Sequence, residues 1–186
     1  MRSLLKFVLP SLLAFTLLTP SVGAAEELVS FKEGAKRMLS GAKKASKLDV
    51  TPTDEEKAKI KGMGVNPDAT YSFLIGKDEA GAPVAAGIVV DQAGKEGPMR
   101  VGVALDPANG KVKEAFVMRF EEERGKPVKE ASFLGQFKGK GPSDAITGGK
   151  DIDIVSGATH SSKAVAEAVK RAVASYKVLV LDRGTK

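Results

Sequence analysis

Apolar residues recur every three or four positions between residues 159 and 176, and this spacing predicts an amphipathic helix. The apolar positions are Ala164, Val165, Ala168, Val169, Ala172, Val173 and Tyr176. The opposite face carries Lys163, Glu167, Lys170, Arg171 and Ser175. We therefore expect one side of the helix to pack against a core and the other side to face solvent.

Between residues 70 and 120 the pattern changes to short apolar runs separated by turn residues, which is typical of strands. The predicted strands are Thr70–Lys77, Pro83–Gln92, Met99–Asp106 and Lys111–Phe120. Tight turns between consecutive strands favour an antiparallel meander. The expected fold class is α+β, with a twisted, mainly antiparallel sheet and helices packed on it.

The region before these strands, residues 26–69, is predicted to be an N-terminal helical segment. One or two short helices are expected within residues 26–47. Thr53 followed by Glu56 resembles a capping box that opens a further helix, which Gly62 and Gly64 end. The lysines between Lys36 and Lys47 favour a solvated face, and docking to a redox partner or to lipid head groups is the alternative.

The first 25 residues have the layout of a signal peptide. Arg2 and Lys6 precede an apolar run from Phe7 to Leu18, and small residues follow it. We expect cleavage near Ala25 and a periplasmic or extracytoplasmic protein. An uncleaved membrane anchor is the alternative, although the apolar run is short for a bilayer span.

Composition narrows the function classes. The chain has no cysteine, so disulfides and thiol chemistry are excluded. Loss of the first 25 residues lowers the formal charge from +6 to +4, and only two Tyr and no Trp are present. This modest excess of positive charge, without a basic stripe or interleaved aromatic residues, argues against nucleic-acid binding. About 160 remaining residues suit one domain.

Four hydroxyl residues surround the predicted start of the helix: Ser156, Thr159, Ser161 and Ser162. Any of them can cap the free backbone amides there. The same helix start can instead bind a phosphate, because its amides and its dipole favour an anion. Gly157 and Ala158 would allow a phosphate close to the backbone. Residue chemistry alone leaves both interpretations open, and caps are the commoner of the two.

The order of residues from Asp153 to Thr159, DIVSGAT, resembles the D-x-x-[ST]-G-A-T flavinylation motif of the FMN-binding domain family, and it matches at every defined position. This family includes the C-type subunit of sodium-translocating NADH:quinone reductases and the G-type subunit of Rnf complexes. The likeness extends over about residues 71–176. We therefore predict an FMN-binding domain over residues 70–182.

The resemblance implies a covalently held cofactor. In the family, a separate flavin transferase joins FMN through a phosphoester bond to the last Thr of the motif, which is Thr159 here. Asp153, Ser156, Gly157 and Ala158 then belong to the segment that the transferase recognises. Ser161, Ser162 and Lys163 complete the predicted cofactor-binding set at the helix start, where the Lys163 ammonium can pair with the phosphate.

Two further residues enter this set through the resemblance. The segment SFLGQFKGK is similar to the family's F-x-x-Q-F segment, in which Phe133 and Phe137 have the spacing of core residues and the Gln136 amide can reach a flavin. Glu122 stands where family members carry an acidic segment beside the flavin. This chain lacks their E-T-P-G form, so a solvated charged loop is the other interpretation.

These features together predict an exported flavoprotein that carries electrons. FMN supplies the redox chemistry, and the expected partners are the flavin transferase and a redox protein or membrane electron-transfer complex. Two alternatives stay open: a non-redox extracytoplasmic binding module and a flavin-dependent reductase with a small-molecule acceptor. His160, the sole histidine, lacks companions at ligand spacing, so we assign it neither a metal nor a catalytic role.

Overall fold

The computed structural model describes residues 26–95, 97–121 and 125–184, so the predicted signal peptide lies outside the described residues. Within these ranges, six strands form one sheet in the order β1-β6-β5-β4-β3-β2, and all neighbours are antiparallel. The strands are β1 (Glu26–Glu27), β2 (Lys44–Val50), β3 (Tyr71–Lys77), β4 (Pro83–Ala93), β5 (Pro98–Leu105) and β6 (Val112–Phe120). The predicted α+β class and its four-stranded meander are confirmed.

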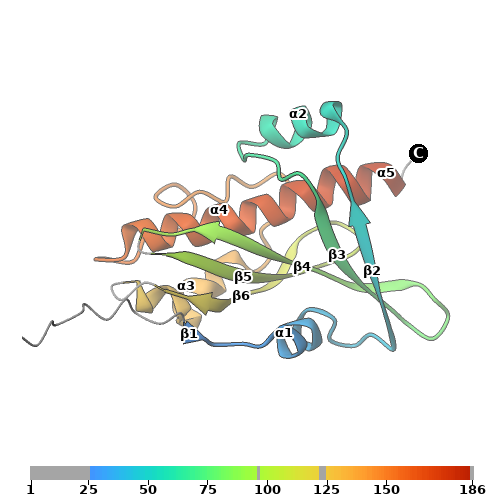
Figure 1. Ribbon diagram of the computed structural model, residues 1–186, viewed down its shortest axis with the longest axis horizontal. Helices are drawn as coiled ribbons and strands as arrows, with labels where there is room; N and C mark the ends of the chain where they lie inside the picture. The colour runs from blue at the N-terminus through green and yellow to red at the C-terminus, as the bar shows by residue number, and fades with distance from the viewer. Residues whose placement is uncertain (1–25, 96, 122–124, 185–186) are drawn as a thin grey trace, which may run out of the picture.

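Helices cover both faces of this sheet (Figure 1). They are α1 (Phe31–Met38), α2 (Asp54–Gly62), α3 (Ala131–Leu134), α4 (Thr159–Tyr176) and α5 (Asp182–Gly184), with short 3₁₀ segments η1 (Lys126–Lys129) and η2 (Gly135–Phe137) and a π-helical turn η3 (Lys177–Leu181). The long helix α4 crosses one face against β4 and β5, whereas α1 packs on the other face.

The single short helix α1 agrees with the one or two helices expected within residues 26–47, but the segment 26–69 is not purely helical, because it also contains β1 and β2. Strand β2 begins at Lys44 and pairs with β3 from Lys44 opposite Lys77 to Val50 opposite Tyr71. Its side chains are exposed except for Val50, so the strand lacks the apolar alternation by which strands are found in a sequence. Its extended conformation is fixed by backbone pairing with β3. The sheet therefore includes residues on both sides of residue 70, where the predicted FMN-binding domain begins.

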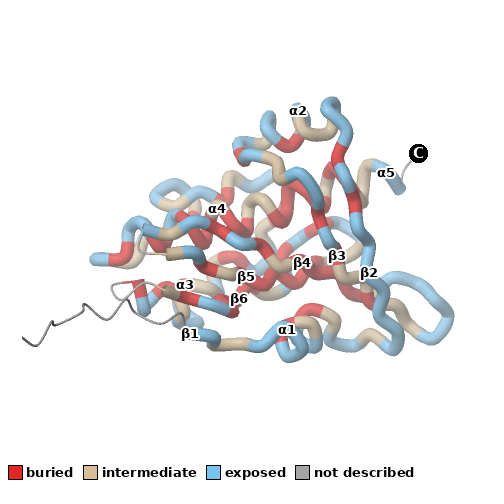
Figure 2. The backbone as a smooth tube through the Cα atoms, viewed as in Figure 1, coloured by how far each residue is buried: buried red, intermediate tan, exposed pale blue. Residues whose placement is uncertain are grey.

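Two apolar cores lie on the two faces of the sheet. The larger core joins α4 to the sheet and includes an edge-to-face contact between Phe73 and Tyr176, whose ring centroids are 5.6 Å apart. The smaller core contains Met38, Ala104, Phe116 and Met118 beneath α1. Gly87 permits this second contact, since a Cβ there would come within 2.6 Å of the Met38 Cβ. The buried backbone in Figure 2 follows α4 and the central strands.

Helix α4 is buried more fully than its pattern predicts. The predicted apolar positions are all buried, which confirms that face. Ser175, expected on the polar face, is instead fully buried, and its hydroxyl donates a 3.1 Å hydrogen bond to the Ala172 carbonyl. This internal bond satisfies the hydroxyl without solvent. Burial also raises the pKa of Tyr176, to about 12, and its hydroxyl donates to the Pro107 carbonyl at 3.2 Å.

The predicted capping box of α2 is confirmed, and it is joined to the C-terminal segment. The Thr53 amide donates to the Glu56 carboxylate at 2.8 Å, and the Glu56 amide donates back to Thr53 Oγ1 at 3.3 Å. Arg183 donates to both Glu56 oxygens, each at 2.7 Å. The Arg183 guanidinium, with the Thr53 amide after it, lowers the pKa of Glu56 from its ordinary 4.5 to about 2.

This lowered pKa predicts a pH-dependent cost for Glu56→Gln. The ionised form contributes stability above pH 4.5, and that stability is lost as the pH falls toward 2. Because Arg183 is partly exposed, we expect a loss of about 1–2 kcal/mol near pH 7 and less than half of that near pH 3. Urea denaturation at both pH values measures it. Glu55→Gln, which breaks an exposed pair with Lys59, should cost less than about 0.5 kcal/mol. Equal losses for Glu56→Gln at both pH values would contradict the assignment.

Candidate functional site

The candidate site is the N-terminal end of α4, where the segment Asp153–Ala158 runs into the helix. The N-cap residue is Ala158, whose methyl side chain makes no capping hydrogen bond. Among the four hydroxyl residues that could cap the helix, Ser162 has a different role. The buried Ser162 hydroxyl instead accepts the Val155 amide at 3.1 Å, which ties the incoming segment to the first turn of the helix.

The predicted attachment residue faces solvent. Asp153, Ser156, Gly157 and Thr159 are exposed, whereas Ala158 is buried and anchors the turn. Gly157 has a φ of +77°, and a Cβ there would meet no atom within 4 Å. Glycine is needed at this position for its left-handed backbone, and the surrounding space is open. An external reactant can therefore reach the Thr159 hydroxyl.

Gln136 fixes the other end of this segment. Its side-chain oxygen accepts the Asp153 amide at 2.7 Å, and its side-chain nitrogen donates to the Asp153 carbonyl at 3.4 Å. Phe133 and Phe137 on either side are buried, with ring centroids 5.5 Å apart, which confirms their predicted place in the core. The buried Phe133 and Phe137 thus hold the segment that carries Gln136, and Gln136 in turn positions the backbone of the motif. A contact between Gln136 and a flavin stays a prediction.

A second anchor, Asp151, was not identified from the sequence. Its carboxylate accepts the amides of Thr147 at 2.8 Å and Ile146 at 3.0 Å, and the Lys140 ammonium at 3.1 Å. Burial raises the pKa of Asp151, but hydrogen bonds from Thr147, Lys140 and Ile146 outweigh this effect and lower it. Asp151 therefore holds the loop that precedes the motif as an ionised carboxylate.

The same loop contains an unusual backbone conformation. Ile146 is buried and has a φ of +44°, a region that β-branched residues rarely occupy. Such a conformation persists only where neighbouring contacts enforce it, and the amide hydrogen bond to Asp151 is one of these contacts. Sequence patterns contain no signal for this arrangement, because it depends on contacts that form only in the folded loop.

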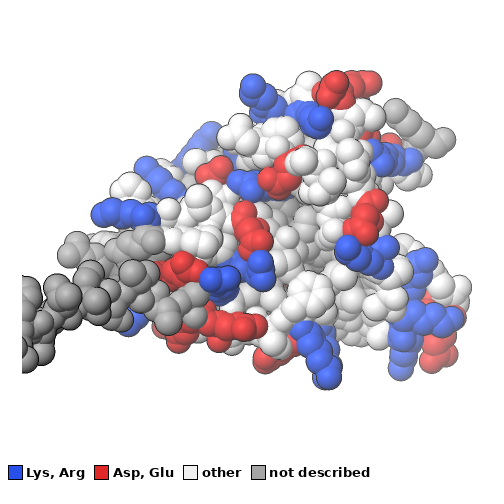
Figure 3. Space-filling view, in the orientation of Figure 1, with Lys and Arg blue, Asp and Glu red and all other residues white. Residues whose placement is uncertain are grey.

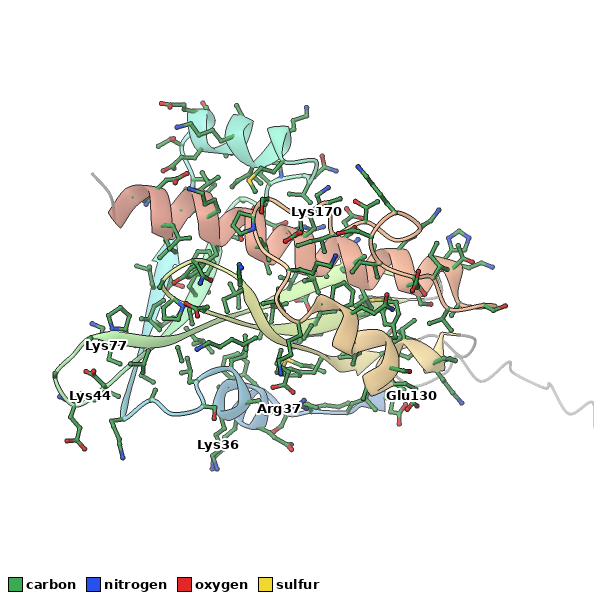
Figure 4. All side chains as sticks on the ribbon, turned by 180° about the vertical axis from the view of Figure 1, so that it is seen from behind. Lys36, Arg37, Lys44, Lys77, Glu130 and Lys170 are labelled. Atoms are coloured by element: carbon green, nitrogen blue, oxygen red, sulfur yellow. The ribbon has the colours of Figure 1, made fainter. Side chains whose placement is uncertain are left out.

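Lys163 lies one turn after Thr159 and is exposed. It lines a cavity of about 330 Å³ between α4 and this loop, together with Gly148, Glu167 and Lys170. Figure 4 shows Lys170 farther along α4, on the same side of the sheet. The first turn of α4 and the Lys163 side chain thus combine a positive helix end with a nearby cation.

Three other residues singled out in the sequence are Ser161, Glu122 and His160. Ser161 is buried at the helix start. Glu122 lies outside the described residues. His160 is exposed, and the ranges that the structure describes contain no group of His, Cys, Asp or Glu able to hold a metal ion. Thr159 thus presents an exposed hydroxyl at the first turn of α4, where the helix amides and the helix dipole favour an anion.

The comparison with protein families agrees with this chemistry, since residues 94–174 match the family model described as FMN-binding domain. Among solved structures, the chain is similar to NqrC of Shewanella oneidensis, with 18% identity over 74% of this chain and 70% of that chain and a TM-score of 0.49. It is also similar to the C-type subunit of the Na(+)-translocating NADH-quinone reductase of Parabacteroides distasonis, with 20% identity over 75% and 78% of the two chains and a TM-score of 0.48. No curated protein matches significantly.

None of the helices in the described part of the chain has the length and apolar character needed to span a membrane.

Proposed function

We propose, from the match of residues 94–174 to the FMN-binding domain model, that the protein is an exported electron carrier that holds FMN through a phosphoester bond to Thr159. One observation carries the proposal. The complete D-x-x-S-G-A-T sequence ends in an exposed threonine at the first position of α4, directly after the N-cap residue Ala158. The hydroxyl is accessible and the adjacent amides are available to an anion.

The residues present fit an FMN phosphate. Gly157 leaves open space beside the backbone, and the first turn of α4 offers amides and the positive end of the helix dipole. Thr159 would hold the phosphorus through its Oγ, with Ser156, Gly157 and Ala158 shaping the turn around it. FMN, when bound, supplies the reversible uptake and release of electrons.

Lys163 is the proposed counter-ion of this phosphodiester, which keeps one negative charge. We expect Lys163→Glu to lower the flavin's reduction potential or the yield of flavinylation, because a like charge then lies one helical turn from the phosphate. Lys170→Glu, two further turns along α4, should change neither. Potentiometry and flavin content measured on both variants test this. Equal values in the two would make Lys163 an ordinary surface lysine.

The resemblance of the D-x-x-S-G-A-T sequence to the family's flavinylation motif supports attachment by a separate enzyme. A flavin transferase is the proposed partner: the Thr159 Oγ–phosphorus bond forms while the P–O bond between that phosphorus and the leaving group of the flavin donor breaks. The leaving group takes the electron pair of the broken bond, the hydroxyl proton is released, and the chain gains the mass of FMN less one water. Asp153 is exposed and stands at the start of the segment that this partner would recognise.

Export and a covalent link support each other. A dissociated flavin would be lost from an extracytoplasmic protein, whereas an esterified one stays. We propose that the signal peptide is cleaved near Ala25 and that the protein passes electrons to or from a redox protein or a membrane electron-transfer complex. N-terminal sequencing of protein from an osmotic-shock fraction tests the location, and an intact Met1 in the membrane pellet would favour an anchor instead.

The two alternative functions are separated by simple measurements. Yellow colour that survives acid precipitation supports covalent flavin, and colourless protein from cells that contain the transferase would support the non-redox binding module. Rapid turnover of a small soluble acceptor would instead support a reductase.

A further inference from the structure

A groove at the far side of the sheet from α4 combines lysines with apolar surface. It is formed by α1 and the segment that leads into β2, has a volume of about 630 Å³, and is lined by Phe31, Lys32, Ala35, Lys36, Leu39, Ser40, Gly41, Ala42, Lys43, Lys44 and Ala45. We call it the α1 groove. Figure 3 shows Lys and Arg side chains along this lower edge of the molecule, with acidic side chains between and beside them.

Phe31 gives the α1 groove an exposed aromatic anchor. Its relative exposure is 58%, and the other large hydrophobic residue exposed in the described ranges is Leu48, at 39%, on the adjoining strand β2. An exposed aromatic ring beside lysines is typical of surfaces that insert into a lipid interface. The packing of α1 does not need this ring, because Met38 on the buried face supplies the contact with the sheet.

The charges of the α1 groove are of one sign. Four lysines line it, namely Lys32, Lys36, Lys43 and Lys44, and no acidic side chain does. None of the four has a recorded ion pair with a described residue, although the Lys44 ammonium donates to the Glu79 backbone carbonyl at 3.5 Å. Arg37 and Lys47, by contrast, are paired with Glu114 and Asp49. The lining lysines therefore keep their charge available to an external anion.

The position of the α1 groove favours a membrane surface over a redox protein as its partner. Figure 1 places α1 beneath the sheet, whereas the α4 N-terminus lies above it and toward the opposite end. If Thr159 carries the flavin, as proposed above, a redox protein docked in the α1 groove would have the sheet between itself and the cofactor. A membrane surface requires no such approach, and docking there leaves Thr159 free to face a redox partner.

We propose that the α1 groove docks the protein onto membranes rich in anionic phospholipid headgroups, with Phe31 entering the interface and the lysines contacting the headgroups. Figure 4 shows Lys36 and Lys44 at the same end of the molecule, with Lys77 close to Lys44. This geometry orients the domain with α1 toward the lipid and α4 away from it. Each lysine near an anionic surface strengthens binding by about fivefold, and the interaction weakens with salt.

The test is co-sedimentation of the purified protein with vesicles of phosphatidylcholine alone or of phosphatidylcholine mixed with phosphatidylglycerol. We expect binding to the mixed vesicles only, and we expect salt to weaken it. Lys36→Gln combined with Lys43→Gln should weaken it by about thirtyfold, and Phe31→Ser by about tenfold. A retained apolar N-terminal segment would bind both kinds of vesicle, so the difference between them isolates the α1 groove.

Lys61→Gln combined with Lys138→Gln is the matched control, because it removes the same net charge from exposed lysines that do not line the α1 groove. It should change vesicle binding by less than about twofold. Thr159→Ala should bind as the wild type does, so failure of flavin attachment and failure of membrane docking are separate results. Equal binding to both vesicle types, or equal effects of the two double variants, would overturn the proposal. Binding to neither vesicle type would also overturn it and would favour an acidic protein partner.

Discussion

Thr159→Ala should yield a folded protein without covalent flavin when it is coexpressed with the flavin transferase. The substitution removes the proposed ester oxygen, and the loss of bound FMN should be complete. Thr159 is exposed and makes no capping hydrogen bond, so the free energy of unfolding should fall by no more than about 0.5 kcal/mol. Visible absorbance after acid precipitation and urea denaturation measure the two effects.

His160→Ala is the neighbouring control for this variant. His160 is also exposed, and no role is assigned to it, so the variant should keep its flavin. Yellow, acid-stable Thr159→Ala protein would contradict the attachment site. Colourless His160→Ala protein would show that flavinylation is sensitive to any change in the first turn of α4.

Asp151→Ala should have the largest effect on stability around the site. The substitution leaves the Ile146 and Thr147 amides and the Lys140 ammonium without their shared acceptor, and it releases the left-handed Ile146. Unpaired amides and a disordered loop should cost about 2–4 kcal/mol. Flavin content should fall as well, because the loop leads directly into the motif. Urea denaturation and absorbance per protein measure both.

Asp144→Ala is the matched control in the same loop. The Asp144 carboxylate accepts one backbone amide, that of Gly141, at 2.8 Å. Its removal should therefore cost only about 1 kcal/mol and leave flavin content unchanged. A cost for Asp151→Ala no greater than that for Asp144→Ala would contradict the anchoring role.

The elements with strong periodic signals were predictable from the sequence. Helix α4 and strands β3 to β6 have apolar residues at the spacing that burial requires, and Thr53 with Glu56 marks the start of α2. Strand β2 was missed because its side chains are exposed and its conformation depends on pairing with β3. The regular spacing of apolar residues in a sequence reflects the burial of their side chains. An edge strand with almost no buried side chain lacks that spacing.

The site was predictable in position but not in its internal contacts. The D-x-x-S-G-A-T order locates the turn before α4, and Thr159 is exposed there. Ser162, one of the hydroxyls that could have capped the helix, instead turns inward and accepts the Val155 amide. Gln136 accepts the amide of Asp153, which is distant in the sequence, and Asp151 accepts the amide of Ile146 only in one loop conformation. The spacing of residues in the sequence does not specify either contact.

Tandem mass spectrometry of the wild-type protein, purified after coexpression with a flavin transferase and digested with a protease, tests the central proposal most directly. The peptide that contains residues 151–163 should carry a mass increase equal to FMN less one water, and its fragment ions should place that increase on Thr159. An unmodified peptide from a yellow protein, or a modification on Ser156, Ser161 or any other residue, would contradict the proposed attachment.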